Sequence, residues 1–328
     1  MKKWLHPGLW LTLAILLVIS IWPILTRDAA LRERTFTILL AIVMASSLNI
    51  ILGYTGYVSF GHVVFYGLGG YMGVYAIDKW GWPLPAGVLL GGLTAGLLAF
   101  LLGRAILRLR GAYFALVTIG INEAMRTFVS NFQPFGASTG IELHFSVYKP
   151  YGGAAEALWL TYYLVVALSL INILLSYWVR QSKLGLGLMA IREDEDAAEV
   201  MGVVAPQYKT LAYVLSAILP GMLGVLFFFK NGTVEPKDAF RLHFSIEAIV
   251  MVMLGGQGTV LGPLVGAWGY QRLRGLLLTT NWKIAGLAIK DFQLVIAGIL
   301  LLLIVLFVPA GLVGWLQQKF SKLRRVLI

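Results

Sequence analysis

The feature that most limits the fold is a run from Thr35 to Ile77 that carries no formally charged side chain. Built as one α-helix it would be roughly 65 Å long, about twice the thickness of the hydrocarbon core of a bilayer. A run of this length has to fold back on itself, and Gly53-Tyr54-Thr55-Gly56-Tyr57 supplies an obvious break. Two membrane spans are therefore predicted, near residues 36–54 and 57–77.

The composition indicates that lipid is the surrounding solvent. Of 328 residues, 59% are hydrophobic and 12% are charged, whereas a soluble protein carries about 25% charged residues. A globular core cannot hide so much apolar surface, and the mean hydropathy of +0.82 agrees. The absence of cysteine excludes disulfides and thiolate metal sites. The net charge of +11 suits contact with anionic headgroups rather than nucleic acid. We predict an integral membrane protein with one domain, residues 1–328.

Other apolar runs predict the remaining spans. Residues 7–26 follow Lys2 and Lys3 and precede no small-residue cleavage site, so they predict a retained first span that starts inside. Further runs of roughly 20 residues match the thickness of a bilayer core. They lie near residues 84–102, 111–131, 158–179, 209–229 and 291–308.

The charge-free stretch 248–271 is either one span or two shorter segments, because it contains Gly255-Gly256-Gln257-Gly258 and Gly262-Pro263. The basic cluster Lys319, Lys322, Arg324 and Arg325 favours a C-terminus inside, which requires the broken pair. The predicted fold is all-α: a polytopic transmembrane helical bundle of about 8–10 spans with glycine-broken segments. Its N-terminus and C-terminus are both predicted to be cytoplasmic.

One long polar island interrupts the apolar runs, from Arg180 to Lys209. It holds five of the fifteen acids of the chain, on the run IREDEDAAEVMG. This run is rich in helix formers, and Gly202 is placed to end it. Six spans from an inside N-terminus put the island in the cytoplasm. A charged helix between spans indicates a docking surface for a water-soluble partner, and a solvated loop is the alternative.

Two glycine breaks have similar spacing: Gly53, Gly56 and Gly61, then Gly255, Gly258 and Gly262. Paired broken segments in the two halves of a transporter indicate internal repeats with a site near the bilayer midplane. Short glycine patterns also arise by chance on helix-packing faces, so both interpretations stay open.

Tests for enzyme chemistry are negative or weak. The sequence contains no G-x-x-x-x-G-K-[ST] phosphate loop and no H-E-x-x-H motif, and its four histidines are scattered. Ser59 and His62 are three residues apart, which raises an intramembrane serine hydrolase. However, Tyr57 stands where a nucleophile elbow needs glycine. We expect both side chains to bond backbone groups freed at the first glycine break.

Glu123 and Arg126 lie within a predicted span, where charged groups are costly and face a cavity or each other. Their i, i+3 spacing allows an ion pair on one helix. A structural pair near the outer interface and a pathway-lining role are both open. Glu247 lies at the start of its predicted span, where the helix dipole alone favours an acid.

Five segments occur in a recognisable order. They are LNIILGYTGYVSFGHVVFYGLGGYMGVYA (48–76), GAYFALVTIGINEAMRTFV (111–129), GLGLMAIREDEDAAEVMGV (185–203), SIEAIVMVMLGGQGTVLGP (245–263) and VLFVPAGLVG (305–314). Together they resemble the branched-chain amino-acid ABC transporter permeases and, of the two permease types, the M-type. The resemblance covers nearly the whole chain, which makes it more specific than any single motif.

The resemblance implies a non-enzymatic permease subunit of an ATP-driven importer in the bacterial cytoplasmic (inner) membrane. It would form half of the translocation pathway for branched-chain (hydrophobic) amino acids. Implied partners are a second homologous permease in a heterodimer, two ABC ATPase subunits and an extracytoplasmic solute-binding protein. No cofactor is expected in this chain, since ATP and Mg²⁺ would be bound by the ATPases.

Two alternatives remain. Relatives that transport urea or short-chain amides share the scaffold. A gradient-driven secondary transporter would be expected to use several intramembrane carboxylates, whereas Glu123 is the one acid well inside a predicted span.

The resemblance also implies which residues act. Asp196-Ala197-Ala198 and Gly202 match the first half of the coupling motif E-A-A-x-x-x-G, with Asp in place of Glu, and the second half is not at its usual distance. In the coupling loop 180–208, the predicted contacts to the ATPases are Arg192, Asp194, Asp196, Ala197, Ala198 and Gly202. The predicted pathway residues at the broken segments are Gly53, Thr55, Gly56, Ser59, His62, Glu123, Gly255, Gly256 and Gly258.

Overall fold

The fold is taken from a computed structural model, which describes residues 7–279, 283–284, 287–288, 293–308 and 310–319. Lys2, Lys3 and the basic residues beyond position 319 lie outside the described residues. The orientation of the two termini depends on those charges, so it stays a prediction.

Helices dominate the described residues, which also form two short antiparallel sheets, β1 with β2 and β3 with β4. The first half contains α1 (Pro7–Thr26), α2 (Ala29–Thr55), α3 (Val63–Trp80), α4 (Leu84–Ile106), α5 (Ala112–Asn131), η2 (Gln133–Phe135), η3 (Ala137–Thr139), β1 (Ile141–Glu142), η4 (Phe145–Tyr151) and α6 (Ala154–Gln181). The second half contains α7 (Lys183–Glu193), α8 (Glu195–Val200), α9 (Ala205–Asn231), β2 (Thr233–Val234), α10 (Pro236–Ala239), α11 (Leu242–Gly255), α12 (Gly262–Thr279), β3 (Lys283–Ile284), β4 (Leu287–Ala288), α13 (Gln293–Phe307) and α14 (Gly311–Lys319).

Each predicted span coincides with a helix. In the part of the chain that the structure describes, five helices are long and apolar enough to cross a membrane: α1, α2, α4, α6 and α9. The other predicted positions hold α3, α5, α11, α12 and α13, which are shorter or more polar. The prediction of an all-α polytopic bundle is confirmed.

The first break differs in detail from the prediction. Helix α2 continues through Gly53 to Thr55 and ends at Gly56, whose φ of 77° is left-handed. The next helix begins at Val63 and not near residue 57. The prediction of helix over 57–62 is wrong, because side chains from distant elements bind the backbone there. The N–H of Phe60 donates to the hydroxyl of Thr118, at 3.1 Å.

The centre of the bundle is held by close helix packing through glycines. Helix α9 lies against α3 and α4, and α2 packs on α9 and α6. A Cβ added to Gly69 of α3 would lie 2.5 Å from the Cα of Gly221 in α9 and 2.7 Å from the carbonyl of Gly91 in α4. Small residues at such crossings let backbones approach, which is how helices associate where lipid removes the hydrophobic driving force.

The second break forms a tight helical hairpin, so the prediction of a broken pair over 248–271 is confirmed. Helix α11 ends at Gly255, Gly256 has a φ of 124°, and α12 begins at Gly262. A Cβ on Gly255 would lie only 1.8 Å from the carbonyl of Gly262. The glycines are thus required for the two half-helices to pack side by side.

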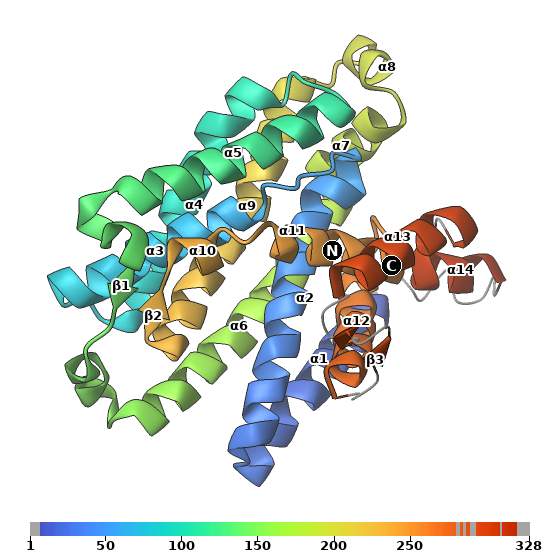
Figure 1. The fold of residues 1–328 in the computed structure, drawn as a ribbon. Helices are drawn as coiled ribbons and strands as arrows, with labels where there is room; N and C mark the ends of the chain where they lie inside the picture. Colours follow the sequence, from blue (N-terminus) through green and yellow to red (C-terminus); the bar gives the residue numbers. More distant parts are fainter. Residues whose placement is uncertain (1–6, 280–282, 285–286, 289–292, 309, 320–328) are drawn as a thin grey trace.

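The two ends of the bundle differ. Figure 1 shows α8 projecting from one end, with α7 beside it, while β1 and the start of α6 lie far from α8. The α8 end therefore carries the polar island of the sequence, held clear of the helical body.

Candidate functional site

The polar island folds as two short helices because of two side-chain caps. The hydroxyl of Ser182 accepts from the N–H of Gly185 at the start of α7. Asp194 has extended backbone angles that end α7, and its carboxylate accepts from the N–H groups of Asp196 and Ala197, both at 3.0 Å. Gly202, with a φ of 88°, ends the segment. The island is thus a folded element rather than one helix or a solvated loop.

The inner face of α8 is anchored by a buried ion pair. Lys209, at the start of α9, is 1% exposed. Its ammonium group donates to Glu195 Oε1 at 2.6 Å, to the carbonyl of Leu107 at 2.7 Å and to the hydroxyl of Tyr57 at 3.0 Å. A lysine ammonium has three donors, and all three are used here. Glu195 is thereby fixed to α9 and to the connections α2–α3 and α4–α5.

Tyr57 completes this cluster as a neutral donor. Its hydroxyl donates to Glu195 Oε2 at 3.0 Å. Burial, and after it the negative charge of Glu195, raises the pKa of Tyr57 above its ordinary value, so the phenol keeps its proton. The carboxylate of Glu195 therefore has a partner on each oxygen.

Arg110 adds a second, more exposed tether. Its guanidinium binds the carboxylate of Asp196 through both terminal nitrogens, at 2.8 and 3.3 Å, and its Nε lies 3.4 Å from Glu195. The hydrogen bond from Arg110 lowers the pKa of Asp196, which is therefore ionised at neutral pH. The planar fork of arginine fixes direction as well as distance, so Arg110 orients α8 against the α4–α5 connection.

A third contact joins α7 to both glycine breaks. Nη1 of Arg192 donates to the carbonyl of Gly53 at 2.8 Å. The side chain of Asn49 accepts from the N–H of Gly258 and donates to the carbonyl of Thr259, both at 2.9 Å. The end of α7, the end of α2 and the α11–α12 break therefore meet at one place.

Glycine is required where these segments meet. A Cβ on Gly53 would lie 2.5 Å from the backbone nitrogen of Gly258 and 2.1 Å from the side-chain oxygen of Asn49. Gly258 itself has a φ of 76°, a conformation that other residues rarely adopt. Neither position can therefore take a larger side chain without a shift of its neighbours.

The outer face of α8 combines exposed acids, Asp196 and Glu199, with apolar side chains at its end. Ala198 is buried against Ile191 and Ala205, which turns the opposite side of the helix to solvent. Val200 is 87% and Met201 is 85% exposed. Two large apolar side chains at the tip of a projecting element form a surface suited to a protein partner.

The predicted coupling residues therefore fall into two groups. Arg192 and Ala198 contact the body of this chain, and Asp194 and Gly202 shape the two turns. Asp196 binds Arg110, but its side chain is 76% exposed. Ala197 is exposed on α8.

Among the predicted pathway residues, the structure brings Gly53 and Gly258 together, with Gly255 and Gly256 in the same break. Thr55 acts locally, because its hydroxyl donates to the carbonyl of Ile51 one turn earlier.

The expected bonds from Ser59 and His62 to the backbone freed at the first glycine break are not present. Both residues are fully buried, and the nearest polar groups that act on them are the hydroxyl of Tyr213 for Ser59 and the backbone of Ser216 for His62. The freed backbone is bonded instead by Thr118, as described above, and by Ser245, whose hydroxyl accepts from the N–H of Val63 at 3.0 Å. Ser59 and His62 do not form a nucleophile–base pair.

The ion pair expected between Glu123 and Arg126 is present, and their side chains are 57% and 43% exposed. Whether the pair is structural or lines the pathway stays a prediction. Glu247 is the buried acid: its side chain is 3% exposed and lies 2.8 Å from His243 and 3.1 Å from both Tyr270 and Arg274. The position of Glu247 near the start of a predicted span did not indicate that these three side chains would surround it.

The other residues that sequence reasoning missed are Lys209, Glu195, Tyr57, Arg110, Asn49, Val200 and Met201. Lys209 reads in the sequence as an ordinary basic residue flanking a span. Its partners Leu107 and Tyr57 are 102 and 152 positions away, which no local pattern reveals.

Comparison with known proteins is consistent with this geometry. The model of the family "Branched-chain amino acid transport system / permease component" matches residues 33–315. The high-affinity branched-chain amino acid transport system permease protein LivM of Salmonella typhimurium is 27% identical, over 94% of this chain and 76% of the relative. LivH of Escherichia coli is 26% identical over 43% of this chain and 42% of its own length. A probable LivM of Methanocaldococcus jannaschii is 23% identical, covering 69% and 68%. No solved structure matches.

Proposed function

The chain belongs to the family of branched-chain amino acid transport permease components, and from this membership we propose that it is one permease subunit of an ATP-driven importer. It forms half of the pathway for branched-chain, hydrophobic amino acids across the cytoplasmic membrane. It is not itself an enzyme: ATP and Mg²⁺ are bound by separate ATPase subunits.

The observation that carries the proposal is the construction of the α7–α8 segment. Its tip presents Val200 and Met201 to solvent, while its inner face is tied to the body through Glu195 and Arg192. The sequence contains no phosphate loop, so the energy of ATP has to arrive through a docked partner. A rigid projecting element with an apolar tip is suited to receive it.

The contacts also supply a mechanism. Closure of the ATPases would displace α8, and two routes carry the displacement onward. Through Glu195 and Lys209 it reaches the start of α9. Through Arg192 it reaches the junction of Gly53 and Gly258. Tilting α9 and shifting the two breaks together would open the pathway to one side and then the other, as rigid-body movements do in other switching proteins.

The proposed complex contains this chain, a second homologous permease, two ATPase subunits and an extracytoplasmic solute-binding protein. Similarity to both LivM and LivH permease proteins supports a pair of related permeases.

The complex is tested by affinity purification of this chain from its native membrane in mild detergent, with partners identified by mass. We expect an ATPase, a second permease and a solute-binding protein whose ligand is leucine, isoleucine or valine. Recovery of the chain alone or self-associated, with no ATPase after cross-linking through α8, would refute the importer.

A further inference from the structure

The connection between α9 and α11 turns back into the interior of the bundle. The ring of Phe240 stacks on Tyr71 of α3, with centroids 6.2 Å apart and planes 11° apart. The hydroxyl of Tyr71 donates to the carbonyl of Val234 at 3.2 Å, and the amide of Asn122 donates to the carbonyl of Phe240 at 3.0 Å. Tyr71 and Asn122 lie in the middle of α3 and α5. Irregular backbone at that depth occurs where it is covered by protein or lines a cavity.

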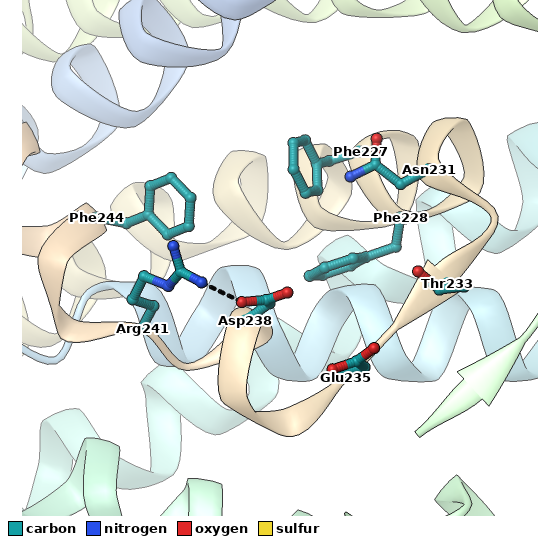
Figure 2. Close-up of a pocket in the computed structure, with 8 residues that line it drawn as sticks. All are labelled: Phe227, Phe228, Asn231, Thr233, Glu235, Asp238, Arg241 and Phe244. Atoms are coloured by element: carbon teal, nitrogen blue, oxygen red, sulfur yellow. Dashed lines mark hydrogen bonds and ion pairs between the residues drawn. The ribbon is translucent and has the colours of Figure 1, made fainter. Parts of the chain in front are cut away.

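This connection lines a cavity of about 160 Å³. Figure 2 shows rings and charges gathered around it. The rings are Phe227, Phe228 and Phe244, and the charged groups are Glu235, Asp238 and Arg241. Charged side chains at membrane depth are costly and mark substrate pathways. The volume is below that of pockets for drug-sized ligands, about 300–1,000 Å³, so the cavity suits a small solute.

The two kinds of charge define the ligand. Arg241 pairs with Asp238, and both side chains are about half exposed, at 50% and 51%. A guanidinium binds a carboxylate as a planar fork, and two carboxylates suit an ammonium group. Arg241 also stands at the N-terminus of α11, which no side chain caps, and a helix N-terminus favours an anion. Such a site fits a zwitterion better than a simple anion or cation.

Tyr66 of α3 lies behind the rings of this cavity and is not part of its lining. It is 2% exposed, and its ring packs against Phe227, Phe228 and Phe244 at 5.9, 5.3 and 6.0 Å. Tyr66 therefore supports the apolar wall of the cavity.

We propose that this cavity holds an α-amino acid with an apolar side chain during transport. Arg241 and the α11 N-terminus bind its carboxylate, Asp238 and Glu235 bind its ammonium group, and the three phenyl rings enclose its side chain. The assignment rests on the proposed transport function and names the place in this chain where the substrate is recognised.

The chain contains no cysteine, which permits a site-directed test in the full-length protein. Thr233 lines the cavity and is exposed. In nanodiscs, Thr233→Cys is labelled with a charged thiol reagent in the presence of L-leucine, L-leucinamide or 4-methylpentanoate. Leucinamide lacks the carboxylate and 4-methylpentanoate lacks the ammonium group. We expect leucine to slow labelling several-fold and each analogue to protect less. Lys79→Cys, exposed on α3 away from the cavity, should be labelled at one rate throughout.

Charge variants in the Thr233→Cys background assign each contact. In Arg241→Gln, protection by leucine should be roughly tenfold weaker or more, and leucine should protect no better than leucinamide. In Asp238→Asn, leucine should protect no better than 4-methylpentanoate. Melting of each variant in detergent checks that it is folded. The assignment would be overturned if leucine gave no protection of Thr233→Cys. It would also be overturned if leucine protected both charge variants as well as it protects Thr233→Cys itself.

ATP-driven leucine uptake by the assembled complex separates the two proposals. Uptake without protection at Thr233→Cys refutes the cavity assignment and leaves the importer proposal standing. Protection without ATP-driven uptake supports the cavity and refutes the importer.

Discussion

At the scale of single residues, the inner end of α8 is held by one fully bonded ammonium group. Lys209 reaches Glu195, Tyr57 and Leu107, which come from three separate segments. Burying a charge is costly, and the cost is offset only where the geometry is complete, as it is here. The pair therefore specifies the position of α8 more than it adds to stability. That role makes the site sensitive to the loss of either partner.

Replacing Lys209 by Met should destabilise the protein by about 3–5 kcal/mol, because Glu195 would remain buried without its main partner. The measurement is thermal unfolding in detergent, followed by tryptophan fluorescence. Arg126→Met is the control, since Arg126 also pairs with an acid, Glu123, but both side chains are about half exposed. Equal midpoints for the two variants would mean that Lys209 is not an anchor.

The junction of the glycine breaks makes a second residue-scale prediction. Gly53→Ala should destabilise by about 1–3 kcal/mol and impair uptake, because its Cβ would meet the backbone of Gly258. Gly120→Ala on α5 meets nothing within 4 Å and should be neutral or slightly stabilising. Uptake and melting are measured for both. A Gly53→Ala protein with normal uptake would show that the junction is not a transmission point.

At the scale of elements, most helix positions can be predicted and their exact ends cannot. Apolar runs of about 20 residues determine where helices lie, as for α1 and α9. The start of α3 at Val63 depends on Ser245, a residue far along the chain, so local pattern could not place it. Gly202 was predicted to end the acidic helix, and it does, but the split at Asp194 depends on a cap that the run of helix formers conceals.

The tip of α8 yields a prediction about docking. Val200→Asp should weaken association with the ATPase by roughly tenfold or more, which is about 1.4 kcal/mol, because it replaces an exposed apolar side chain of the proposed docking tip by a charge. The protein itself should stay folded, since Val200 is 87% exposed. Val200→Leu keeps the apolar surface and serves as the matched control. Co-purification of the ATPase measures the effect, and equal recovery from both variants would remove the tip from the interface.

At the scale of the whole molecule, segments far apart in sequence form one mechanical unit. Residues 49–57, 192–209 and 256–259 are joined by hydrogen bonds at the α8 end of the bundle. The sequence predicts the glycine breaks and the charged island separately, from composition and spacing. It does not predict that they touch, because Arg192 and Gly53 are 139 positions apart. The internal-repeat interpretation of the two breaks stays a prediction, as does the single domain.

The proposed coupling of ATP hydrolysis to transport through α7–α8 is tested by the ratio of L-leucine taken up to ATP hydrolysed by the complex in proteoliposomes. Gly202→Pro and Asp196→Lys are compared with Gly81→Pro. Gly202 and Gly81 both have positive φ, both donate a backbone hydrogen bond at a helix end, and both have no neighbour within 4 Å of an added Cβ.

We expect Gly202→Pro and Asp196→Lys to keep a folded membrane domain but to lose most of the uptake per ATP, while Gly81→Pro keeps the wild-type ratio. Wild-type ratios in Gly202→Pro and Asp196→Lys, or uptake that continues without ATP and stops when an ion gradient is dissipated, would contradict it.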